Sequence, residues 1–294
     1  MKILVLADIH GNLPALNAVL TEVEEEGVDQ ILVAGDILGG PYPVEVIRIL
    51  YDLKACMIRG NSDEYIVNIY SNPTDSKWYK SKQFAPVYWI YKHLNQHWLN
   101  FINSLPKQKV ISLEGTDDIL MVHSIYLPML PTDASGVLIT DKYYDLVDSY
   151  TKSIEQQVLI FGHNHVHWNQ KVNTCLALNP GSVACPLNGT IGAQYAIIEW
   201  VHDHWEADIR SVSYNLQEIN DAFVESGFLK EGGSIARLLL YNINTGKDIM
   251  GMFLRFVYKL AYKEGYRDAK FIPDKVLELA EKKWDWNKYI RENE

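Results

Sequence analysis

The sequence contains few cysteines, and their number and spacing argue against a fold cross-linked by disulfide bonds. It has three, Cys56, Cys175 and Cys185, among 294 residues, and no two of them form a Cys-x-x-Cys pair. An odd number of widely separated cysteines favours a reducing compartment over secretion. We therefore expect a cytoplasmic protein without a disulfide framework and without a structural zinc site built from thiolates.

Long hydrophobic runs are also missing. No uninterrupted apolar run approaches the roughly 20 residues that a helix needs to span a bilayer. The N-terminal segment MKILVLADIHGN is interrupted early by Asp8 and His10, which is not the pattern of a signal peptide. We therefore expect no membrane partner.

Positive charge is in deficit. The chain has 27 Lys and Arg residues against 37 Asp and Glu residues, for a formal net charge of −10. Without a broad basic face, stable binding to a nucleic-acid backbone is not expected. A nucleotide substrate held by metal ions is still compatible with this charge. Hydrophobic residues make up 48% of the chain, which is typical of a globular protein with one large domain, alone or with an appendage.

Short apolar segments alternate with amphipathic ones over the first sixty residues. Strand patterns lie at 2–7, 30–34 and 55–58, and apolar residues recur at helical spacing between 13 and 26. This rhythm predicts a largely parallel sheet with helices outside it. Two more strand patterns lie at 119–122 and 158–161. The patterns from residue 174 onward predict antiparallel strands of a second sheet.

Two other regions have a helical pattern. Residues 64–105 are helical and rich in aromatics, and we interpret them as an insertion into a domain that spans residues 1–214. After residue 214 helical runs lie near 216–228, 234–243, 247–265 and 273–290, which predicts a C-terminal helical extension over 215–294. The extension either caps the crevice at the strand ends or faces a second subunit, so a homodimer is possible.

Five of the apolar segments end in side chains that bind metal ions. These side chains are Asp8 with His10, Asp36, Asn61, His123, and His163 with His165. Because the carboxyl ends of the strands line one crevice in an open α/β sheet, we expect these groups to converge there. Imidazole, carboxylate and amide ligands suit Mn²⁺ or Fe, and also Zn²⁺. A carboxylate such as Asp36 can bridge two ions about 3.5–4 Å apart.

The order D-x-H, G-D-x-x-G, G-N, H and G-H-x-H resembles that of the calcineurin-like metallophosphoesterase superfamily. The likeness covers residues 8–165, and Asn-Pro-Gly-Ser at 179–182 extends it to the compact bacterial and archaeal branch. It implies a four-layer α/β/β/α sandwich of two mixed β-sheets flanked by helices. It also implies two divalent metal ions, one held by Asp8, His10, Asp36 and His165, the other by Asp36, Asn61, His123 and His163.

The resemblance further implies a phosphoesterase in which a metal-bridging hydroxide attacks phosphorus in line, with Asp36, Asn61 and His123 at the catalytic centre. Many relatives have a histidine after the G-N motif, whereas this chain has Ser62. Because a serine does not act as a general acid near pH 7, a good leaving group is favoured. The predicted substrate is small and phosphorylated, and a phosphodiester, a dinucleoside polyphosphate or another nucleotide anhydride is preferred.

Two other functions stay open. A phosphomonoesterase or protein phosphatase needs another proton donor, for which Asp63, Arg59 or a further histidine is available. A non-catalytic metal-binding scaffold is less favoured, because every ligand position is filled.

Four residues near the expected crevice are predicted to bind substrate. Arg59 would grip a phosphate, with a structural ion pair as the alternative. Asn12 would orient a phosphate, with helix capping as the alternative. Tyr42 and Tyr126 are the aromatic residues closest to the motifs, and they are predicted to stack on a base.

Overall fold

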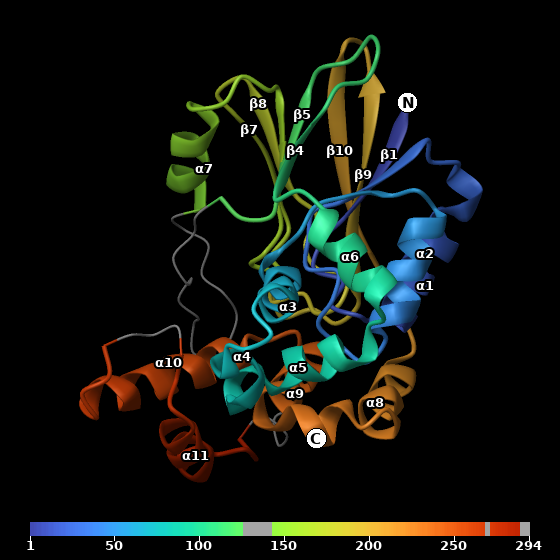
Figure 1. Ribbon diagram of the computed structural model, residues 1–294. Coiled ribbons are helices and arrows are strands. Elements are labelled where there is room, and N and C mark those ends of the chain that lie inside the picture. Colours follow the sequence, from blue (N-terminus) through green and yellow to red (C-terminus); the bar gives the residue numbers. More distant parts are fainter. Residues whose placement is uncertain (126–142, 268–270, 289–294) are drawn as a thin grey trace.

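The computed structural model describes residues 1–125, 143–267 and 271–288, and two five-stranded β-sheets packed face to face form its centre (Figure 1). The first sheet has the order β10-β9-β1-β2-β3. Its strands are β1 (Lys2–Leu6), β2 (Gln30–Val33), β3 (Cys56–Met57), β9 (Ala193–Val201) and β10 (His204–Val212). β1, β2 and β3 run parallel, whereas β9 is antiparallel to β1 and to β10.

The second sheet has the order β4-β5-β6-β8-β7. Its strands are β4 (Gln108–Ile111), β5 (Ile119–Val122), β6 (Val158–Ile160), β7 (Trp168–Val172) and β8 (Cys175–Asn179). β5, β6 and β8 run parallel, and the two edge strands are antiparallel to their neighbours. Apolar side chains such as Val5, Met121 and Ile160 fill the space between the sheets.

The assignment of strands to sheets corrects one expectation. The strands after residue 174 do not together form an antiparallel second sheet, because β9 and β10 join the first sheet and β8 lies parallel to β6. Apolar alternation identifies a buried face, but it does not specify the partner strand. The second sheet instead begins earlier, at β4.

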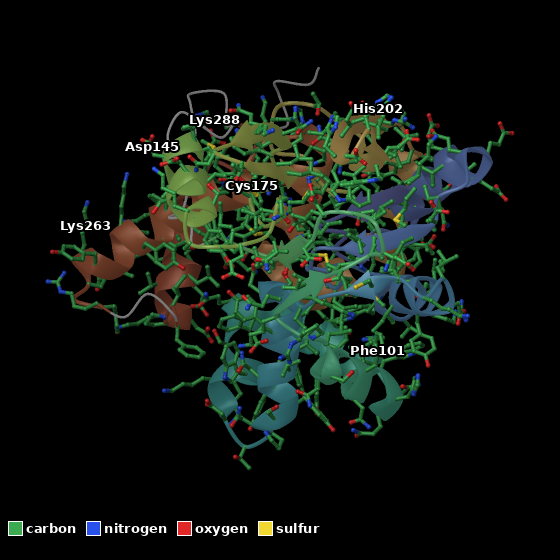
Figure 2. The ribbon with its side chains drawn as sticks, turned by 90° about the horizontal axis from the view of Figure 1, so that it is seen from above. Phe101, Asp145, Cys175, His202, Lys263 and Lys288 are labelled. Carbon is green, nitrogen blue, oxygen red and sulfur yellow. The ribbon has the colours of Figure 1, made fainter. Side chains whose placement is uncertain are left out.

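Helices cover both outer faces, which gives the four layers expected from the sequence. α1 (Leu13–Val23), the short η1 (Glu24–Glu26) and α2 (Pro43–Asp52) lie on the first sheet, and α8 (Leu216–Glu225) packs against α1 near the end of that sheet. α7 (Tyr143–Thr151) covers the second sheet. Seen from above in Figure 2, α7 with Asp145 lies beside the strand that carries Cys175.

The remaining helices gather at one end of the two sheets (Figure 1). The sequence between β3 and β4 contributes α3 (Asn61–Ser71), α4 (Ser76–Lys80), η2 (Lys82–Phe84), α5 (Ala85–His93) and α6 (Gln96–Ser104). The C-terminal part contributes α9 (Phe228–Thr245), α10 (Ile249–Lys263) and α11 (Asp274–Lys283). Within the described ranges, no helix combines the length and apolarity needed to cross a membrane.

The two groups of helices pack against each other. Trp89 of α5 and Phe228 of α9 meet edge to face at a centroid distance of 5.0 Å. Lys92 Nζ and Glu231 Oε2 form an ion pair at 2.7 Å beside them. The C-terminal helices were expected either to cap the crevice at the strand ends or to face a second subunit. In the structure they pack on the 64–105 helices beside the strand ends.

Candidate metal centre

The loops after β1, β2, β3, β5 and β6 carry all seven residues that the sequence predicts as metal ligands, and the structure brings these residues together. A first group forms around two imidazoles. His10 Nε2 lies 3.1 Å from His165 Nε2, and Asp8 Oδ1 lies 3.5 Å from the latter. The three donor atoms lie within 4.8 Å of one another, so they converge on one small volume.

A second group forms around the Asn61 amide. Its Oδ1 atom lies 2.7 Å from His163 Nδ1 and 3.1 Å from His123 Nε2. Asp36 lies between the two groups, with Oδ1 3.4 Å from His123 Nε2 and Oδ2 3.5 Å from His10 Nε2. The carboxylate thus presents one oxygen to each group. Which ion each residue holds stays a prediction.

The backbone at these positions is unusual. Asp8, His10, Asp36, His163 and His165 all have φ between 43° and 79°, a left-handed conformation that is uncommon for residues other than glycine. Hydrogen bonds between the loops hold this conformation, as from Asp8 N to Gly35 O at 3.1 Å. Such conformations cluster at functional sites, because the surrounding fold must enforce them.

Backbone carbonyl groups fix the ring orientation of two of the histidines. His123 Nδ1 donates to the Ala34 carbonyl oxygen at 2.8 Å, and His165 Nδ1 donates to the Cys185 carbonyl oxygen at 2.9 Å. A backbone acceptor at Nδ1 fixes the tautomer and leaves the Nε2 lone pair free to bind a cation. Both Nε2 atoms face the centre.

The electrostatics of the cluster fit a bound cation. Asp8 is fully buried, and its Oδ1 atom has no hydrogen-bond partner among the described residues. Burial raises the pKa of Asp8 to about 8 and lowers the pKa of His10 and of His163 to about 4. The neutral imidazoles of His10 and His163 and the uncompensated buried carboxyl group of Asp8 are groups that a divalent metal ion would satisfy.

The loop that contains Gly60 fits closely around Asp36. A Cβ atom on Gly60 would lie 2.1 Å from Asp36 Oδ1, so only glycine lets the backbone come this close to the carboxylate. Ser62 holds the same carboxylate through its backbone N at 2.8 Å and its Oγ at 3.0 Å. Ser62 therefore positions the Asp36 carboxylate.

Asp63 has a structural role. It is fully buried, and its two carboxylate oxygens accept from the backbone N–H groups of Ile37, Leu38 and Gly60 at 2.9–3.2 Å. The carboxylate therefore ties the loop after β2 to the start of α3. It is not placed to give a proton to a leaving group.

Of the predicted substrate-binding residues, Arg59 forms contacts on the chain segment that leads into Asn61. Its Nε atom lies 3.5 Å from Glu64 Oε2, and its Nη1 atom donates to the Asn103 carbonyl oxygen at 3.3 Å. The ion pair considered for it is therefore present. Arg59 also lines a cavity of about 330 Å³ together with Asn61 and His123.

Asn12 and Tyr42, two other residues predicted to bind substrate, have structural contacts in the described part of the chain. Asn12 is buried and caps α1, where its Oδ1 accepts from Ala15 N at 3.2 Å, and its Nδ2 donates to Tyr214 Oη at 3.0 Å. Tyr42 packs half-buried against the core beside α2 and lines neither described cavity. Tyr126 lies outside the described residues.

A larger cavity of about 460 Å³ also adjoins the centre. One wall carries His10, Asp36, Asn61, His163 and His165. The opposite walls come from η2 and α5 of the 64–105 region and from α9 and α10. These wall residues were not predicted from the sequence, where the apolar faces of the helices indicate burial but not a cavity.

Comparisons with known proteins identify the family of this chain. Residues 1–203 match the model of the calcineurin-like phosphoesterase superfamily domain. The uncharacterised protein MJ0912 of Methanocaldococcus jannaschii is 28% identical over 241 residues, which are 76% of this chain and 92% of that protein. The phosphodiesterase YfcE of Escherichia coli K12 is 21% identical over 210 residues, which are 68% of this chain and 88% of that protein.

Solved structures share the fold. A metallophosphoesterase from Sphaerobacter thermophilus superposes with a TM-score of 0.62 at 25% identity, and the match covers 84% of this chain and 100% of that one. The hypothetical protein PH1004 of Pyrococcus horikoshii superposes with a TM-score of 0.64 at 22% identity. That match covers 81% of this chain and 97% of PH1004. Since the family model covers more than half of the chain, and the chain has the superfamily's two-sheet fold, the chain belongs to the calcineurin-like phosphoesterase superfamily.

Proposed function

We propose that the protein is a two-metal-dependent hydrolase of phosphodiesters or nucleotide anhydrides. The observation that carries this proposal is the position of Asn61, which lines both the larger and the smaller cavity. A phosphorus atom held at the centre would have room for one substituent on each side. A phosphodiester or anhydride has two such substituents, whereas a phosphomonoester has one.

Two metal ions fit the donor atoms present. Asp8, His10 and His165 would hold one ion, Asn61, His123 and His163 the other, and Asp36 both. The nitrogen and oxygen donors suit Mn²⁺ or Fe, and also Zn²⁺. Bound there, the ions would neutralise charge on the phosphoryl group and make a water molecule nucleophilic at neutral pH.

The chain's own groups would position the substrate. Asn61 and His123 lie at the mouth of the smaller cavity and would orient the phosphoryl group. Arg59 and Lys107 line the same cavity and would attract a second phosphate or another anionic substituent. Ser62 donates its hydroxyl hydrogen to Asp36 and supplies no proton to the leaving group, which favours substrates whose leaving group is already a stable anion.

Two relatives support a hydrolase. The similar protein of Escherichia coli is named a phosphodiesterase, and the similar structure from Sphaerobacter thermophilus is titled a metallophosphoesterase. The nucleotide substrate, the native metal, the homodimer and the cytoplasmic location stay predictions from the sequence.

The test compares bis-p-nitrophenyl phosphate with p-nitrophenyl phosphate as substrates of the Mn²⁺-loaded protein. Both release the same good leaving group, so the ratio of their kcat/KM values reports the preference for a diester or a monoester. A dinucleoside polyphosphate with identified products extends the test to anhydrides. A higher kcat/KM for the monoester would favour the phosphomonoesterase alternative.

A further inference from the structure

The larger cavity has walls that suit a hydrocarbon. We propose that it binds an aliphatic chain attached to the phosphoryl group, so that the substrate is an amphiphilic phosphoester. This inference rests on the proposed function and specifies its substrate class. The chain would extend from the metal centre between α5, α9 and α10.

The walls of the cavity are aliphatic. Val87 and Ile90 line it from α5, Leu239 from α9, and Met250 and Leu254 from α10. Leu38 and Leu187 add two more aliphatic side chains near the metal centre. Because each buried methylene is favourable by about 0.8 kcal/mol, such walls bind hydrocarbon well and offer little to a polar group.

The charged groups in the helical walls, Arg255 and Asp248, are paired with each other. Arg255 is the one Lys or Arg side chain among the described residues that line this cavity, and its Nη1 atom lies 3.4 Å from Asp248 Oδ2. Asp248 Oδ1 also accepts from Gly251 N at 2.8 Å at the start of α10. A polyphosphate chain would therefore find no uncompensated cation on this side.

Two of the aromatic residues that line the cavity, Tyr65 and Phe84, are packed in an aromatic cluster. Tyr65 and Phe84 meet edge to face at 5.3 Å, and Phe84 packs on Trp78 at 4.9 Å. Phe84 is buried in this aromatic cluster. A nucleobase needs an open aromatic face and hydrogen-bond partners for its edge, and the packed rings of Tyr65 and Phe84 offer little of either. The aliphatic side chains outnumber the one other aromatic ring among the described residues of these walls, that of Tyr258, so the walls as a whole favour a hydrocarbon.

The two cavities differ in a way that orients the substrate. The smaller one contains Arg59, Lys107 and Glu64, with Lys107 Nζ 2.8 Å from Glu64 Oε1, so it offers charged groups. The larger one offers apolar walls. A substrate with its phosphoryl group at Asn61 would therefore place its polar substituent beside Arg59 and its hydrocarbon between α5, α9 and α10.

The test uses n-alkyl p-nitrophenyl phosphates, from ethyl to octyl, with the Mn²⁺-loaded protein. Water adds to phosphorus, the bond from phosphorus to the aryl oxygen breaks, p-nitrophenolate leaves, and the alkyl phosphate keeps its chain. We expect kcat/KM to rise about threefold to fourfold per methylene, on the order of a hundredfold from butyl to octyl. The p-nitrophenyl ester of thymidine 5′-phosphate should react less well than the octyl ester.

A matched pair of variants locates the effect. Leu254 and Leu260 are both half-buried on α10 and pack on the same apolar cluster, but only Leu254 lines the cavity. Leu254→Asn should flatten the dependence of kcat/KM on chain length, whereas Leu260→Asn should preserve it. Circular dichroism of both variants checks that they fold.

The outcomes separate the two claims. Metal-dependent turnover that is independent of chain length, or that favours the thymidine ester, would overturn the hydrocarbon inference and leave the proposed function standing. No metal-dependent turnover of any ester would contradict the proposed function itself. An equal loss of chain-length dependence in both α10 variants would also overturn the assignment of the cavity.

Discussion

The buried Asp8 carboxyl group should destabilise the metal-free protein. Replacing Asp8 with Asn should therefore make the metal-free protein more stable. The side chain is fully buried, and no hydrogen bond satisfies its Oδ1 atom within the described parts of the chain. Asn is nearly isosteric with Asp and keeps an acceptor oxygen for the His163 backbone N–H, which Asp8 Oδ2 accepts at 2.9 Å. Asp8→Asn therefore removes the ionisable group with little change in packing.

The size of the effect follows from the pKa of Asp8. Burial raises it from an ordinary value of 3.8 to about 8. Below pH 3.8 both the folded and the unfolded states are protonated, so the group costs nothing. As pH rises toward 8, the unfolded chain ionises while the folded state stays protonated, and the cost at pH 7 reaches about 4 kcal/mol.

The assay is thermal unfolding at pH 7 with EDTA and with Mn²⁺. At about 2–4 °C per kcal/mol, Asp8→Asn should raise the Tm of the metal-free protein by up to roughly 8–16 °C. Mn²⁺ should raise the Tm of the wild type, because it binds the folded state alone, and should raise that of the variant much less. A lower metal-free Tm for the variant, or equal stabilisation of both proteins by Mn²⁺, would refute the reasoning.

Three further substitutions test the loop that holds Asp36. Gly60→Ala would put a Cβ atom 2.1 Å from Asp36 Oδ1, so metal content and hydrolysis should both fall, the latter about a hundredfold; normal values would contradict the close fit. Ser62→Ala loses only the hydrogen bond from Oγ to Asp36. Because one hydrogen bond contributes about 1 kcal/mol, the substitution should lower kcat severalfold and leave the metal content unchanged. Asp63→Asn exchanges an acceptor oxygen for an N–H donor among three backbone N–H groups and should lower Tm by several degrees; an unchanged Tm would contradict its structural role.

The convergence of the ligands was predictable from the sequence for a geometric reason. β1, β2 and β3 are parallel, and so are β5 and β6, so residues that follow these strands meet at one end of the sheets. The position of Asp36 between the two histidine groups required the structure, because it depends on how the two sheets face each other. Sequence spacing carries no information on that packing.

Several side chains have roles that pattern reasoning could not separate. Asn12 was predicted to orient a phosphate or to cap a helix, and the structure shows the cap. Asp63 was a possible proton donor, and the structure shows it holding three backbone N–H groups. Polar residues beside a motif look alike in sequence, whether they face the substrate or the backbone.

The placement of β9, β10 and the C-terminal helices was also beyond the sequence. An amphipathic pattern defines which face of an element is buried, but not which neighbour buries it. The sequence pattern therefore placed β9 and β10 in the second sheet, whereas in the structure they belong to the first. For the same reason, the cavity between α5, α9 and α10 could not be anticipated, since its walls come from segments more than a hundred residues apart.

The most direct test of the account is hydrolysis of bis-p-nitrophenyl phosphate by the purified protein after metal removal and after reconstitution with Mn²⁺. The wild type should be inactive without metal and active with it. Asp36→Asn should be inactive in both conditions and bind fewer ions, because Asp36 presents an oxygen to each ligand group. Activity that survives metal removal, or that Asp36→Asn leaves unchanged, would contradict the assignment of this site as the catalytic centre.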